Sequence, residues 1–211
     1  MIELGALSGA LFPDAPAARL YGVAIGIVTN NKDPEGQARV KVKCPWLGDD
    51  YESFWARLVT PMAGNGRGLF LLPEVDDEVV VAFEHGTPGS AFILGALWNG
   101  RDKPPESTVD HHTLKSRTGH IVRLDDTNGD EKIEILDKTG NNRIVIRAAE
   151  NSITIEAKAD IEVKSEGGAL TLSGKGIAIK STAGVTISSA QNVDVKANAG
   201  LTLKGATIDL N

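Results

Sequence analysis

The residues that could take part in catalysis are few, and their spacing does not assemble a catalytic site. Cys44 is the single cysteine, and it lies on the apolar side of the alternating run ARVKVKCPW (38–46). We expect it to be a small buried core residue rather than a nucleophile. No Gly-x-Ser-x-Gly motif occurs, so the sequence predicts no catalytic residue and no enzymatic activity.

Three further patterns resemble ligand sites but lack essential parts. His111-His112 does not have the spacing that brings two imidazoles onto one metal ion, and we interpret it as a solvated pair in a linker. Asp126-x-Asn128-x-Asp130 has the oxygen spacing of a calcium loop, but Glu131 stands where that loop needs glycine. GNGRG (64–68) does not open a helix and favours a barrel loop over a phosphate site. We therefore expect no metal and no cofactor.

The charges of the chain disfavour nucleic acid as a partner. Arg39, Lys41 and Lys43 alternate with valines and could contact a nucleic-acid backbone. However, the formal net charge is −6, and residues 113–211 carry as many basic as acidic side chains, so the acidic excess lies in residues 1–112. We interpret the basic row as solvated or as facing another subunit.

The N-terminal sequence and the apolar runs bear on localisation. Residues 1–20 have no basic n-region, and we expect no signal peptide. No apolar run approaches 18 residues, so we also expect no membrane span.

The elements that would position any site are β-strands throughout. From Ile121 the sequence repeats short apolar/polar alternations such as IVRL, IEIL, ITIE and VDVK, which are typical of half-buried strands. From Ile153 these runs begin seven to nine residues apart. Every aromatic residue lies at or before Trp98 and no proline follows Pro105, so only aliphatic side chains can close the core of this repeat.

A unit of about eight residues is too short to be one coil of a single-chain solenoid, whose repeats are roughly 20 residues or longer. It fits one side of a triangular prism built by three chains, so we predict a triple-stranded β-helix that exists only as a homotrimer. The predicted axis contains Ile153, Ile155, Ile161, Val163, Leu170, Leu172, Ile177, Ile179, Val185, Ile187, Val193, Val195, Leu201 and Leu203.

The remaining chain divides by pattern. Residues 21–100 contain five or six short strands, among them the segments 54–61 and 68–73, and predict a small barrel of the OB type. Residues 101–120 form a polar link. Residues 121–136 form a hairpin across Asn128-Gly129, which leads the predicted β-helix at 121–211.

Residues 1–20 form an N-terminal arm with five large apolar side chains, Ile2, Leu4, Leu7, Leu11 and Phe12. Packing of this arm on its own domain and docking on a neighbouring subunit both remain open. The fold class is therefore all-β, an N-terminal OB-fold barrel followed by a triple-stranded β-helix of three intertwined chains.

The runs GQARVKVKCPWLG, FWARLVTPMAG, GLFLLPEVDDEVVVAFEHG and AFILGALWNGRDKPP resemble the OB-fold domain of phage baseplate assembly protein V and of the VgrG spikes of type VI secretion. SRTGHIVRLDDTNGDEKIEILDKTGNN resembles the connector at the head of the needle in that group, and the repeat resembles its β-helix. The resemblance covers residues 20–211. It implies a homotrimeric, non-enzymatic spike on the axis of a contractile injection machine, assembled in the bacterial cytoplasm and touching the target membrane only on injection.

Departures from the family pattern indicate which partners to expect. Only about 20 residues precede the OB region, so the resemblance implies a separate hub protein, contacted by the arm. No histidine follows His120, which disfavours a self-made metal tip and implies a separate PAAR-type tip protein on Ile208, Leu210 and Asn211.

Three other functions remain as alternatives. They are a trimeric tail fibre or adhesin, a single-chain solenoid acting on polysaccharide, and an OB-fold nucleic-acid-binding module. Residues 160–211 lack the aromatic platforms and paired carboxylates that a polysaccharide-cleaving solenoid needs.

Overall fold

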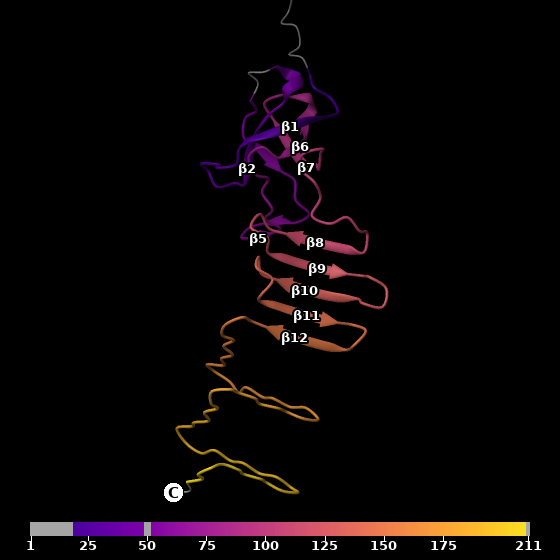
Figure 1. Cartoon of the computed structure of the whole chain (residues 1–211). Coiled ribbons are helices and arrows are strands. Elements are labelled where there is room, and N and C mark those ends of the chain that lie inside the picture. The colour runs from indigo at the N-terminus through magenta and orange to yellow at the C-terminus, as the bar shows by residue number, and fades with distance from the viewer. Residues whose placement is uncertain (1–18, 49–51, 210–211) are drawn as a thin grey trace, which may run out of the picture. The chain divides into compact units, whose positions relative to one another are not determined.

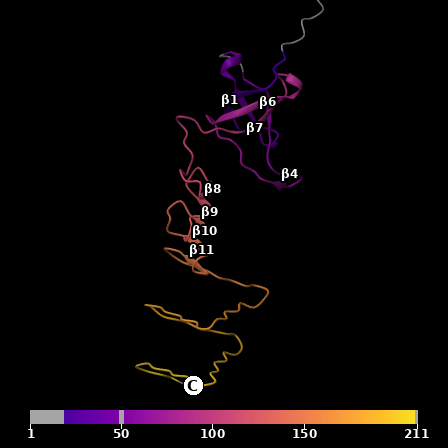
Figure 2. The same cartoon turned by 90° about the vertical axis from the view of Figure 1, so that its right-hand side faces the viewer.

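The computed structural model describes residues 19–48 and 52–209. The chain divides into two compact units, Met1–Lys158 and Ala159–Asn211. In the described residues, the regular elements are β-strands and two short 3-10 helices, η1 (Pro45–Leu47) and η2 (Glu84–Gly86). Figure 1 and Figure 2 show these elements in two views. No helix in these ranges is long and apolar enough to cross a membrane.

The first part of unit 1 is a closed five-stranded barrel. Its strands are β1 (Val23–Asn30), β2 (Arg39–Lys43), β3 (Ala56–Leu58), β6 (Glu78–Phe83) and β7 (Ala91–Ala96), in the order β1-β2-β3-β7-β6. All neighbours are antiparallel except β3 and β7, which are parallel. The barrel confirms the predicted all-β fold with an OB-type barrel.

Alternation along each barrel strand places its core. Along β6, partly buried and fully buried residues alternate, so that Val79 and Val81 point inward. The buried cluster consists of Val28, Val40, Val42, Cys44, Ala56, Val79, Val81, Phe83, Ala91 and Ile93. Cys44 therefore is a core residue, as predicted, and burial raises the pKa of its thiol.

The segment 68–73 differs from its prediction. Its apolar composition indicated a strand, but the described chain there forms only the short hairpin β4 (Ala63–Gly64) and β5 (Arg67–Gly68), and residues 69–73 have no strand. Leu69, Phe70 and Leu71 are exposed. A run of apolar residues without alternation does not separate a strand from a surface loop.

The second part of unit 1 is a five-stranded antiparallel sheet. Its strands are β8 (His111–Lys115), β9 (Ile121–Asp125), β10 (Lys132–Leu136), β11 (Arg143–Arg147) and β12 (Ser152–Glu156), paired in chain order. The turns are tight, with Gly129 at φ 81° between β9 and β10 and Asn151 at φ 50° between β11 and β12. Pairing within the chain thus extends to Glu156, well beyond the hairpin expected at 121–136.

Unit 2 has a different character. Residues 159–209 run as extended segments joined by bends, without an assigned strand among the described residues. They form the yellow end of the trace in Figure 1. Every described residue from Lys158 to Asp209 is exposed. A single chain does not test pairing between chains, so the triple-stranded β-helix stays a prediction.

Gly26 in β1 generates a test of the barrel packing. A Cβ at this buried position would lie 2.9 Å from Val81 Cγ2 and 3.3 Å from Val42 Cβ. We expect Gly26→Ala to lower the free energy of unfolding of the barrel by about 1–3 kcal/mol, as overpacking does. Chemical denaturation followed by tryptophan fluorescence measures the change.

Gly95→Ala in β7 is the matched control, because no atom lies within 4 Å of its added Cβ. We expect it to be neutral or slightly stabilising, since alanine restricts the unfolded chain. Equal losses in both variants would contradict the packing described for Gly26.

Candidate functional site

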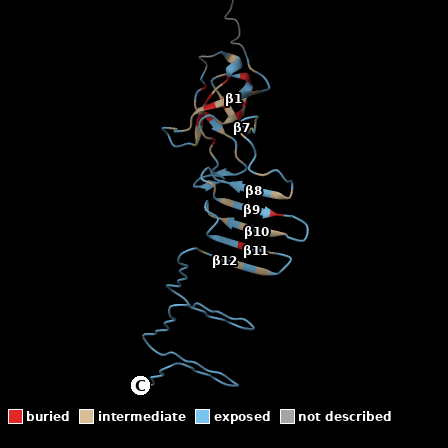
Figure 3. Ribbon diagram, in the orientation of Figure 1, coloured by how far each residue is buried: buried red, intermediate tan, exposed pale blue. Residues whose placement is uncertain are grey.

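One face of the β8–β12 sheet is a continuous aliphatic surface, which we call the aliphatic face. Cross-strand pairs such as Ile133 with Leu124 and Ile146, and Ile144 with Ile155, place these side chains in rows. Figure 3 shows how much of the sheet is exposed. Its members are 39–69% exposed: Leu114, Val122, Leu124, Ile133, Ile135, Ile144, Ile146, Ile153 and Ile155.

The same exposure continues through the predicted axis residues. Ile153 and Ile155, the first two, lie on the aliphatic face. The remaining twelve, from Ile161 to Leu203, are 54–72% exposed. The structure does not bring these twelve into contact with one another, so their place on a trimer axis stays a prediction.

The trimer axis predicted from the sequence does not include seven residues of the aliphatic face. They are Leu114, Val122, Leu124, Ile133, Ile135, Ile144 and Ile146. The six on β9 to β11 carried the same period-two alternation, whereas Leu114 lies in HHTLK, whose strand pattern is weak. The register of β8 to β12 shows that they belong to the same rows as Ile153 and Ile155.

An aliphatic surface of this size is expected to be buried against another surface. Fully burying a Val, Leu or Ile side chain is worth about 1.5–3 kcal/mol, and soluble monomers rarely expose large contiguous apolar patches. The described residues of the chain leave the rows open. The arrangement therefore suits association rather than catalysis.

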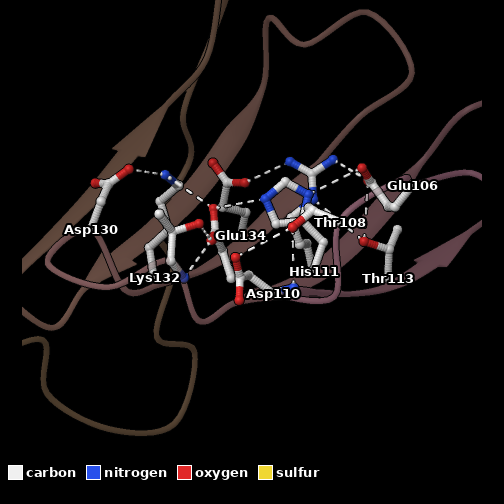
Figure 4. Close-up of polar contacts among 11 residues, drawn as sticks. Glu106, Thr108, Asp110, His111, Thr113, Asp130, Lys132 and Glu134 are labelled. Carbon is white, nitrogen blue, oxygen red and sulfur yellow. Dashed lines mark hydrogen bonds and ion pairs between the residues drawn. The ribbon is translucent and has the colours of Figure 1, made fainter.

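The opposite face, which we call the polar face, holds a network of ion pairs centred on Arg123. The Arg123 guanidinium donates to Glu106, before β8, and to Glu134 on β10, with a 3.0 Å bond to Glu134 Oε2. Figure 4 shows the network. Glu106 also accepts a hydrogen bond from Thr113 on β8. The network thus links β8, β9 and β10 through their side chains.

A second group on the polar face surrounds Asp125 at the end of β9. Asp125 Oδ1 accepts the backbone N–H of Thr127 at 3.0 Å, which holds the β9–β10 turn. Lys132 Nζ lies 3.2 Å from Asp125 Oδ2 and also contacts Asp130. Hydrogen bonds from the Thr127 hydroxyl and backbone, together with Lys132, hold the pKa of Asp125 well below its usual range.

His111 corrects one sequence interpretation. Instead of being a solvated linker residue, it lies on β8 with Nδ1 3.1 Å from Glu106 and Nε2 3.4 Å from Asp125, and its side chain is 22% exposed. His112 points to the other side of the strand and is 63% exposed. Local sequence gave no sign of these contacts, because they depend on the pairing of β8 with β9.

The remaining candidate ligand sites are occupied by internal contacts. Arg39 pairs with Asp33 at 2.7 Å, and Lys41 pairs with Glu52 at 2.9 Å. Two of the three basic residues considered for nucleic acid are thus neutralised within the barrel. Within residues 19–48 and 52–209, no three His, Cys, Asp or Glu side chains gather as a metal site would require.

The predicted partner contacts lie mostly beyond the described ranges. Ile2, Leu4, Leu7, Leu11 and Phe12, assigned to the hub contact, fall outside them. So do Leu210 and Asn211, assigned to the tip contact. Ile208 is described and is 49% exposed.

The Arg123 network leads to a mutational test. We expect Arg123→Ala to lower the unfolding temperature of the protein by at least about 4 °C, because Glu106 and Glu134 lose their shared cation on a half-buried face. Arg143→Ala is the matched control on the same sheet, since its ion pair with Glu156 is nearly half exposed. Equal shifts in the two variants, measured by scanning calorimetry, would contradict a structural role of the network.

Acid titration tests the same network. Hydrogen bonds from His111 and Arg123 lower the pKa of Glu106 from 4.5 to about 2. The unfolded chain takes up this proton first, so the stabilisation is present above about pH 4.5 and is lost as pH falls towards 2. The difference in unfolding temperature between the wild type and Glu106→Gln should therefore shrink steadily over that interval. A difference that stays constant from pH 6 to pH 2 would refute the assignment.

Comparison with known proteins agrees with the barrel. Residues 24–98 match the family described as "Type VI secretion system/phage-baseplate injector OB domain". The type VI secretion system spike protein VgrG4b of Pseudomonas aeruginosa (strain PAO1) is 30% identical over 138 residues, covering 56% of this chain and 17% of the relative.

Two further spike proteins of that strain, VgrG1a and VgrG1c, are each 25% identical over 162 residues. These alignments cover 68% and 73% of this chain but only 25% and 21% of the relatives. The chain therefore spans a quarter or less of the lengths of these relatives. The barrel and these similarities show that residues 24–98 form a domain like the injector OB domain of type VI secretion systems and phage baseplates, and that the chain resembles part of the VgrG spike proteins.

Proposed function

We propose that this chain forms the homotrimeric spike of a contractile injection machine, such as a phage tail, a tailocin, or a type VI or extracellular injection system. The observation that carries the proposal is that the alternating aliphatic side chains are exposed both on the β8–β12 sheet and in the sequence from Ile161 to Leu203. Three copies placed around one axis would bury these side chains against one another. The relatives named as spike proteins support the same role.

The mechanism is mechanical. In the described residues 159–209 the backbone hydrogen bonds go only to serine side chains, as from Ala183 and Gly184 to Ser181, and none joins two backbone groups. The remaining backbone groups would therefore pair with the two sister chains. A chain in such a shaft cannot leave without breaking all of these hydrogen bonds. If each turn uses three eight-residue sides at a strand spacing of about 4.8 Å, the shaft rises roughly 14 Å per turn. It would act as the rigid front of a following tube and pierce the target envelope when the machine contracts.

The polar side chains support a structural role over an enzymatic one. The possible nucleophile Cys44 is fully buried, and burial raises the pKa of its thiol. His111 is engaged by two carboxylates in the polar network. We therefore assign no catalytic residue to the chain.

The two ends of the spike would take different partners. The arm at 1–20 would contact a separate hub protein through Ile2, Leu4, Leu7, Leu11 and Phe12. At the other end, Ile208 is 49% exposed, and Ile208, Leu210 and Asn211 would form the contact for a separate tip protein. A PAAR-type tip protein fits that position.

A trimeric tail fibre or adhesin is the second candidate, because it would bury the same aliphatic rows. The two differ in where they sit on the particle. A spike lies on the central axis, whereas a fibre projects from the side.

Labelling of assembled particles separates the two functions. We expect gold labels on the chain to lie on the particle axis in negative-stain images, with a label fused to the C-terminus further from the tube than a label fused to the N-terminus. An unlabelled particle preparation treated with the same gold reagent is the control. Labels placed laterally around the baseplate would overturn the spike in favour of the fibre.

A further inference from the structure

The backbone partners of this chain change abruptly near Lys158. From His111 to Glu156, each strand pairs with a neighbour in the same chain, and the connecting turns are short. From Ala159 to Asp209, no described residue belongs to a strand. The same apolar alternation therefore occurs in two states, one paired into a sheet and one without strand pairing among the described residues.

The polar face determines which side of the sheet is aliphatic. A slip of one residue between neighbouring strands would turn every aliphatic side chain to the opposite face. Arg123 contacts Glu106 and Glu134, and Lys132 contacts Asp125, across the observed register of β8, β9 and β10. These charged groups satisfy one another within the chain, so they hold the register before any partner arrives.

We propose that the aliphatic face of β8–β12 is the surface on which three copies of this chain first associate, and that residues 159–209 pair between chains only afterwards. This inference rests on the proposed trimeric spike and adds the order and the site of its assembly. It assigns the polar-face residues Arg123, Asp125 and Lys132 a positioning role, because they fix the register of the aliphatic face.

A second copy fits this face better than an unrelated partner. On the aliphatic face, the side chains that β9 to β12 contribute are uncharged and aliphatic, so two such faces can meet without burying an unpaired charge. The alternation also continues past Lys158 in the same chain. A sister chain therefore presents matching aliphatic side chains along the whole length, which only an identical pattern supplies.

The order follows from conformational entropy. The β8–β12 sheet closes turns of a few residues within one chain, and its backbone is already ordered when it meets a partner. Residues 159–209 must lose the backbone freedom of three chains at once, at roughly 1–2 kcal/mol per residue ordered. Association through the paired sheet brings the three unpaired segments together before that cost arises.

Two matched substitutions in the full chain test the order. Ile146→Thr lies on the aliphatic face and Ile187→Thr lies in the repeat, and threonine keeps the β-branched side chain in both. Refolding from denaturant is followed by light scattering for trimer formation, and dissociation is followed in the reverse direction. A contact present in the rate-limiting step slows assembly when weakened, whereas a later contact mainly speeds unfolding.

We expect Ile146→Thr to slow trimer formation by about tenfold, because three copies of the side chain are weakened in one step. Ile187→Thr should form trimers at nearly the wild-type rate. Residues 159–209 should unfold faster in this variant than in the wild type. Slow assembly in Ile187→Thr with normal assembly in Ile146→Thr would overturn the proposal. Equal slowing of both variants would also overturn it.

Pulsed hydrogen exchange on the refolding wild-type protein is a second test, and it does not depend on whether a variant folds. Amides of residues 111–156 should become protected before the trimer mass appears, and amides of residues 159–209 only with it or later. Simultaneous protection of both segments would contradict the proposed order. If the wild-type chain never forms a trimer, the proposed spike function itself is wrong. Failure of the assembly order and failure of the proposed function therefore give different results.

Discussion

In the described chain beyond the barrel, the arrangement of side chains depends on the fact that a β-strand has two faces. Successive side chains point to opposite faces, so a strand of alternating residues always makes one aliphatic face and one polar face. In β8–β12 the chain satisfies the polar face by itself, through Arg123, Asp125 and Lys132. The aliphatic face remains open, and only another surface of the same kind can cover it at low cost.

The barrel and the sheet differ in whether the chain itself covers their aliphatic side chains. In the barrel, β1-β2-β3-β7-β6 closes on itself, so Val40, Val42 and Val79 face an interior made by the same chain. The β8–β12 sheet is open, and its aliphatic residues face outward. One chain therefore combines a barrel that covers its own aliphatic side chains with a sheet that leaves them exposed.

Much of this architecture could be predicted from local patterns, and the failures have physical reasons. The alternation of Val40 with Val42 placed β2 and the burial of Cys44, and the Asn128-Gly129 turn placed the β9–β10 hairpin. The loop at 69–73, in which Leu69, Phe70 and Leu71 are exposed, was misread because an apolar run carries no periodicity. β8 was missed because HHTLK has a weak strand pattern.

The polar-face contacts were beyond sequence reasoning for a different reason. His111 meets Asp125 only through the register of β8 on β9, and Arg123 joins Glu106 to Glu134 across two strand pairs. The aliphatic face was predicted in kind, and in part by residue, since Ile153 and Ile155 were identified whereas Ile133 and Ile146 were not. The burial of the aliphatic face by sister chains is a proposal, and it is tested by experiment.

The most direct test of the central claim is the mass of the full-length protein in solution by sedimentation equilibrium at neutral pH. Three chains held together by their aliphatic rows predict a single species with the mass of a trimer. A folded monomer that keeps these rows exposed would contradict the claim.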